Sequence, residues 1–206
     1  MHRHVLLPLL CLSLLLPAVA AGAAKTSWAQ PQIKLVTSHG LMGGDASTFK
    51  PDLPLTQSAL ADVVAELTDQ EAAAPAVPEA PVSMAGLDGS LVKALGLRDA
   101  ATAFASGART AGLAPPTRFG NEVVARLIGL RTNHPTGQDS LELLPKDPAT
   151  RAEAAFSVAA ILGFGDWQAN ELRDEALTFE LPDLTTWQRK ILQTAVSFIG
   201  FPYVWG

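Results

Sequence analysis

The feature that most constrains the fold of this chain is a short proline pattern that occurs twice. Residues 51–56 read Pro-Asp-Leu-Pro-Leu-Thr, and residues 145–150 read Pro-Lys-Asp-Pro-Ala-Thr. Proline keeps the residue before it extended, and Thr is a favoured helix N-cap. We therefore expect a helix to begin within about two residues of Thr56 and another within about two residues of Thr150. Repeated units of this kind bury their apolar faces on one another.

The residues after each pattern support these two helices. Apolar side chains follow at the i, i+3, i+4, i+7 spacing of one helix face. They are Leu60, Val63, Val64 and Leu67 in the first unit and Ala155, Val158, Ala159 and Leu162 in the last. A weaker third copy is expected at residues 115–118, Pro-Pro-Thr-Arg, followed by Val124, Leu127 and Ile128. Hydrophobic residues make up 48% of the chain but aromatic residues only 6%, a composition that favours closely packed helices.

The units resemble S-layer homology repeats, in which a helix, a glycine-containing loop and a Phe-x-Pro approach precede a helix starting Thr-Arg-Ala-Glu. The first unit has Trp28, a loop at 39–44 and Phe49-Lys-Pro51, but its helix start reads Thr56-Gln-Ser-Ala. The last unit keeps Thr150-Arg-Ala-Glu153 intact. The middle unit has only Thr117-Arg118, after a helical stretch at about 97–112. The resemblance implies a mainly α fold, with three units in one pseudo-threefold helical bundle.

Composition shifts suggest where the units end. We expect a signal peptide, a first repeat, an extended Ala/Pro-rich linker, two further repeats, an acidic connector and the start of another domain. These segments cover residues 1–23, 24–70, 71–82, 83–164, 165–184 and 185–206, respectively. The connector is expected to contain a short helix near Trp167 to Leu172.

The last segment reads as a capped helix followed by a turn. Thr185 and Gln188 have the spacing of a capping box, Gly200 ends the helix and Pro202 prevents it from resuming. An apolar stripe is expected on its inner face. The stripe consists of Trp187, Ile191, Val196 and Ile199.

This segment resembles the opening of NlpC-type cysteine peptidases, which cut bacterial cell-wall peptides after a Gly-x-Pro-Tyr-x-Trp-Gly-Gly turn. Gly200, Pro202, Tyr203, Trp205 and Gly206 match that turn. The resemblance implies the first helix of a truncated, papain-like α+β domain, with Tyr203 lining the substrate groove. The family's nucleophilic Cys and its His base would follow residue 206. We therefore expect no catalytic residue and no cofactor in the chain as given. The alternative is a non-catalytic, secreted wall-anchoring protein whose last residues only mimic the peptidase.

The first residues predict export. A weakly basic start precedes an apolar run at 5–16, and small-x-small patterns follow at 18–20 and 21–23. Cleavage would remove Cys11, the only cysteine, so that neither a disulfide nor a thiol nucleophile remains. The net charge of −5 disfavours nucleic acid, and an anionic ligand must therefore be captured locally. We expect a secreted, wall-associated protein that binds peptidoglycan or a secondary cell-wall polymer, with no membrane contact after processing.

Thr150, Arg151 and Glu153 allow two interpretations. Thr150 and Glu153 form a capping box in the first, and Arg151 is merely solvated. In the second, which the S-layer homology resemblance implies, Arg151 presents its guanidinium to an anionic group of a wall polymer at a helix N-terminus. Lys146 and Arg118 are weaker accessory candidates, and His39 and His134 are expected to be ordinary loop residues.

Overall fold

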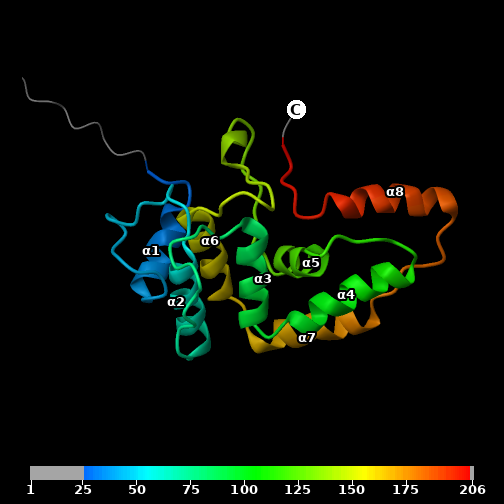
Figure 1. Ribbon diagram of the computed structural model, residues 1–206, viewed down its shortest axis with the longest axis horizontal. Helices are drawn as coiled ribbons and strands as arrows, with labels where there is room; N and C mark the ends of the chain where they lie inside the picture. Colours follow the sequence, from blue (N-terminus) through cyan, green and yellow to red (C-terminus); the bar gives the residue numbers. More distant parts are fainter. Residues whose placement is uncertain (1–25, 205–206) are drawn as a thin grey trace, which may run out of the picture.

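The computed structural model describes residues 26–204 and is mainly helical (Figure 1). The expected signal peptide, Trp205 and Gly206 lie outside the described residues. The α-helices are α1 (Gln30–Ser38), α2 (Gln57–Thr68), α3 (Met84–Ala94), α4 (Arg98–Thr110), α5 (Phe119–Leu127), α6 (Arg151–Ile161), α7 (Asp166–Thr178) and α8 (Thr186–Ser197). A short 3-10 helix, Asp139–Leu141, lies in the loop before α6.

Three extended segments meet in a closed ring of backbone hydrogen bonds. The N–H of Leu55 donates to the carbonyl of Ala149 (2.8 Å), that of Ala149 to Val82 (2.8 Å), and that of Val82 to Leu55 (2.9 Å). The residue after each ring member is the N-cap of a helix: Thr56 for α2, Ser83 for α3 and Thr150 for α6. This ring gives the bundle the pseudo-threefold centre expected from the repeats.

Carbonyl groups of each extended segment also accept hydrogen bonds from the first amides of a neighbouring helix. The first amide of α2 donates to Ala80 O, that of α3 to Asp147 O, and that of α6 to Leu53 O, all at 2.9 Å. The second amides donate in the same order to the carbonyls of Pro78, Pro145 and Pro51. Helix starts leave amides without intrahelical partners, and here the proline segments accept them. The pattern that predicted two helix starts thus also joins the units.

The third copy of the pattern is not where the sequence suggested. It is the run from Pro78 through Pro81 to Ser83, in the stretch expected to be an extended linker. Residues 115–118, the predicted third copy, instead precede α5, whose N-cap Arg118 makes no side-chain capping bond. The surrounding Ala/Pro-rich composition concealed the true copy, as did a Ser in place of Thr at the cap.

Two helices cover the central ones from outside. Helix α1 packs on α6, and α5 packs on α3. Both outer helices end in the same way: Gly40 and Gly129 have φ of +71° and +74°, and the next residues, Leu41 and Leu130, donate back to the carbonyls of Val36 and Ala125. The segments that contain α1 and α5 are therefore structurally equivalent when Gly40 is aligned with Gly129.

Helices α4 and α7 extend the bundle to one side and pack on each other (Figure 1). Ala169, Leu172 and Ala176 of α7 are buried, and the ring of Phe104 in α4 lies 5.2 Å from that of Phe179. The expected connector with a short helix is thus a packed helix of 13 residues. Helix α8 follows it and returns toward α5 (Figure 1).

Candidate wall-polymer site

The start of α6 is satisfied entirely within the protein. Thr150 caps it as predicted, because its hydroxyl accepts from the amide of Glu153 (3.2 Å). The amides of Arg151 and Ala152 donate to Leu53 O and Pro51 O. The first three amides of α6 are therefore occupied, and an anion at this helix start would have to be bound by side chains.

Arg151 is a structural link as well as a candidate ligand group. Its Nε donates to the carbonyl of Phe49 (2.9 Å) and its Nη2 to that of Gly43 (3.3 Å), and the guanidinium lies 4.4 Å from the centre of the Phe49 ring. The side chain is half-buried, and this burial lowers its pKa. The interpretation in which Arg151 is merely solvated is wrong. Guanidinium has five N–H donors, and those not used on this loop remain for a ligand.

Glu153 does not complete the expected capping box. Its Oε1 lies 3.2 Å from His134 Nε2, and both residues are buried. Burial raises the pKa of Glu153, and the hydrogen bond to His134 opposes that rise. The backbone N–H of His134 donates to Glu142 Oε1 (2.5 Å), and its ring meets that of Trp28 edge-on, with 4.4 Å between the ring centres. His134 is in a loop as predicted, and the carboxylates of Glu142 and Glu153 both contact it.

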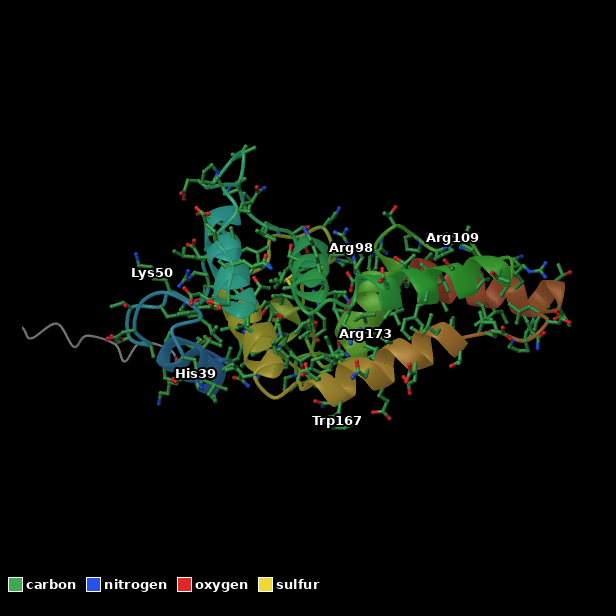
Figure 2. The ribbon with its side chains drawn as sticks, turned by 90° about the horizontal axis from the view of Figure 1, so that it is seen from below. His39, Lys50, Arg98, Arg109, Trp167 and Arg173 are labelled. Carbon is green, nitrogen blue, oxygen red and sulfur yellow. The ribbon has the colours of Figure 1, made fainter. Side chains whose placement is uncertain are left out.

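The weaker candidates fall in different places. Lys146 is exposed, and His39 is exposed at the end of α1, where its Nδ1 lies 2.9 Å from Leu35 O (Figure 2). Arg118 instead holds the end of α8: its Nε donates to Ile199 O (3.0 Å) and its Nη2 to Ser197 O (2.9 Å).

Helix α8 carries apolar side chains on two faces. Thr185 and Gln188 form the predicted capping box. Val196 and Ile199 are half-buried against the body, whereas Trp187 and Ile191 are exposed, so the single stripe that was predicted is divided. Tyr203, the predicted substrate-groove residue, has an exposed side chain, and its backbone N–H donates to Asn133 Oδ1 (3.4 Å).

A buried polar cluster between α3 and α5 was missed from the sequence. Arg131 Nη1 lies 3.3 Å from Asp88 Oδ2, and both side chains are almost fully buried. Burial raises the pKa of Asp88 to about 7, while Arg131 opposes the shift and the nearby Glu122 adds to it. Glu122 is fully buried, and neither of its carboxylate oxygens has a hydrogen-bond partner among the described residues.

The helix pair α1 and α6, which is equivalent to α5 and α3, has apolar residues at the positions of this polar cluster. With Gly40 aligned on Gly129 and Thr150 aligned on Ser83, the counterparts of Glu122, Arg131 and Asp88 are apolar and buried. They are Ile33, Met42 and Ala155. Three positions that are apolar and buried in the α1–α6 pair are therefore occupied by charged residue types in the α5–α3 pair. An internal alignment on the two glycines could have revealed this from the sequence.

No arrangement for a metal appears in the described part of the chain: residues 26–204 contain no group of three or more His, Cys, Asp or Glu side chains placed to hold one. No helix among these residues has the length and hydropathy needed to span a bilayer.

Comparison with known proteins identifies the first unit. The family model described as the S-layer homology domain matches residues 23–61, which include Trp28, the glycine loop, Phe49 and the capping Thr56. No curated protein and no solved structure matches the chain. S-layer homology domains bind secondary cell-wall polymers, and such a domain indicates a cell-surface, wall-anchored protein. Residues 23–61 thus contain an S-layer homology domain, within a mainly helical chain that carries two further copies of its helix-start pattern.

Proposed function

We propose that the chain is the wall-associating N-terminal part of a secreted peptidoglycan endopeptidase. The S-layer homology domain supports the wall association. The peptidase assignment is supported by residues 185–204, where the capped helix α8 is followed by a turn at Gly200, with φ of +88°, that leads into Pro202 and Tyr203.

Within the wall-associating part, Arg151 is the residue proposed to touch the polymer. Glu153 is buried against His134, and the Thr150 hydroxyl is occupied as a cap, so these two residues position the helix start. Arg151 alone among the three keeps N–H groups that the protein does not use. A planar guanidinium already fixed by Phe49 is preorganised for a carboxylate or phosphate.

The observation that carries the peptidase proposal is the position of α8. Arg118 holds its C-terminal end to the body, while its outer face exposes Trp187, Ile191 and Phe198. Contiguous exposed apolar side chains usually mark an interaction surface. In an NlpC-type domain, the first helix packs on the rest of that domain, and this face of α8 would serve that contact.

The alternative remains a non-catalytic anchoring protein. It is favoured by one fact: Cys11, in the expected signal peptide, is the only cysteine, so the chain as given can form no covalent intermediate at a thiol.

Co-sedimentation with purified cell-wall sacculi tests the wall-binding part. We expect the chain to bind, Arg151→Gln to bind at least ~10-fold more weakly, and Arg151→Lys to recover only part of the affinity. Lys146→Gln is the matched control, because Lys146 is exposed in the segment just before α6. Circular dichroism must show that each variant is folded. Equal binding by wild type and Arg151→Gln would remove Arg151 from the site.

The peptidase part needs a separate test. The gene should be read beyond codon 206, where the proposal expects a Cys shortly after the turn and a His further on. The extended protein should hydrolyse cell-wall stem peptides, and its Cys→Ala variant should bind sacculi but not cleave. If the reading frame encodes no such Cys, the non-catalytic alternative is correct.

A further inference from the structure

A solvent-open pocket lies between α3, α4 and α5, away from the start of α6. Its volume is about 230 Å³, and small residues form its floor, among them Gly89, Ala101 and Gly120. Gly120 leaves no space for a side chain, because a Cβ there would collide with the carbonyl of Ala101. Helices α4 and α5 therefore approach closely at Gly120 and Ala101, and both residues line the pocket.

The equivalent place in the other helix pair is filled by aromatic rings. There, Trp28 before α1 and Phe156 in α6 pack with their ring centres 5.8 Å apart. The alignment given above makes Thr117 the counterpart of Trp28 and Gly89 the counterpart of Phe156, and both line the pocket. The pocket thus lies where a hydroxyl-bearing side chain and a hydrogen occupy the positions that two large rings occupy in the other helix pair.

The walls of the pocket are cationic. Lys93 of α3 and Arg98 and Arg109 of α4 line it. None of these three forms an ion pair within residues 26–204. No acidic residue lines the pocket, although the chain has a net charge of −5. Arg98 and Arg109 lie toward one edge of the molecule, and Trp167, beside the acidic outer face of α7, lies at the opposite edge (Figure 2).

We propose that this pocket binds an anionic sugar residue, namely a sugar that carries a carboxylate or a phosphate. The guanidinium groups of Arg98 and Arg109 and the ammonium of Lys93 line the pocket at different places, and each offers charge-assisted donors to an anionic group. Asn121, Thr102 and Thr117 add neutral donors and acceptors of the kind that sugar hydroxyls need. The pocket accommodates one sugar residue and is distinct from the proposed Arg151 contact, because its lining contains no residue of α6 or of the 43–49 loop. The proposal does not depend on the peptidase assignment.

The test is a ¹H–¹⁵N NMR titration of the full chain without its expected signal peptide. The probes are galacturonic acid and glucose 6-phosphate, with galactose and inorganic phosphate as controls. We expect at least one anionic sugar to bind saturably and to shift amides of α3, α4 and α5. Arg98→Gln and Arg109→Gln should each weaken binding about 10-fold, and Lys93→Gln should weaken it less. Lys34→Gln, on α1, is the control for the loss of one exposed helical charge.

A second variant tests the pocket without removing charge. Thr117→Trp restores the ring present at Trp28 and should abolish binding while the spectrum stays folded, since Thr117 is exposed. The proposal is overturned if neither anionic sugar binds, or if Arg98→Gln and Arg109→Gln leave affinity unchanged. Equal binding of inorganic phosphate and glucose 6-phosphate would exclude sugar recognition. Arg151→Gln should keep the pocket affinity, which separates this test from that of the wall-polymer site.

Discussion

Gly200 rests directly on the buried carboxylate of Glu122. A Cβ at residue 200 would lie 2.5 Å from the Glu122 Cδ and 2.7 Å from each carboxylate oxygen. Gly200 also has φ of +88°, a conformation that side chains rarely adopt. The turn after α8 can therefore pack against α5 because residue 200 has no side chain. The hydrogen bonds from Arg118 hold the same turn.

We predict that Gly200→Ala detaches the turn after α8 from α5. The left-handed backbone alone costs about 1 kcal/mol, and the added methyl group must also displace a buried carboxylate. The matched control is Gly137→Ala, because Gly137 has φ of +86° but nothing within 4 Å of its missing Cβ. Amide hydrogen exchange in residues 186–201 should rise for Gly200→Ala only. Similar exchange in both variants would mean that the contact with Glu122 contributes nothing.

The sequence predicted those parts of the structure that are set by local rules. Thr56, Thr150 and Thr185 cap their helices as expected, since an N-cap acts on an amide only three residues away. Two other assignments were wrong because distant residues decided them. Glu153 pairs with His134 instead of its own N-cap, and Arg151 binds carbonyls of the 43–49 loop.

The Asp88 and Glu122 cluster could not be found by local rules either. A charged side chain is ordinarily assigned to the surface, but Asp88 shares the buried face of Met84 and Leu91, and the packing of α5 on α3 buries both acidic residues. The pocket above Gly89 depends on the same packing. The sequence indicates the pocket only when two units are compared: Trp28 and Phe156 are aromatic, whereas their counterparts Thr117 and Gly89 are not.

The raised pKa of Asp88 predicts that stability falls as pH rises. The folded state keeps the Asp88 proton up to about pH 7, whereas the unfolded chain releases it near the ordinary value of 3.8. Between these two pH values the folded state binds more protons than the unfolded chain. The free energy of unfolding therefore decreases as pH rises, by up to about 1.4 kcal/mol per pH unit. Glu153, whose pKa burial also raises, acts in the same direction.

Asp88→Asn should remove most of this dependence, because the amide cannot ionise. Urea unfolding at several pH values from about 4 to about 7 measures the pH dependence of the free energy of unfolding. The control is Asp62→Asn, at an exposed position on α2. The difference in unfolding free energy between Asp88→Asn and wild type should grow with pH. A difference that stays constant over this range would show that Asp88 ionises normally in the folded protein.

Arg151→Ala should destabilise the fold in addition to any effect on wall binding. The change removes two hydrogen bonds from a cation to carbonyls and the contact with the Phe49 ring. Because the group is only half-buried, we expect a loss of about 1–2 kcal/mol. Lys146→Ala should change stability by less than about 0.5 kcal/mol. Thermal unfolding checks both, and equal midpoints would mean that Arg151 is solvated after all.

The backbone ring can be tested inside the stretch that the sequence suggested was a linker. Val82→Pro removes the N–H that donates to Leu55 O, and the ring opens at one of its three bonds. We expect a loss of about 3 kcal/mol or more, since a buried carbonyl also loses its partner. Val82→Ala keeps the N–H and measures the packing loss alone, and Val77→Pro places the same residue at an exposed position of the same stretch. Chemical unfolding should rank Val82→Pro as far the least stable of the three. If Val82→Pro and Val77→Pro were tolerated equally, residues 71–82 would behave as the extended linker first expected, and the three helices would not be held by a common ring.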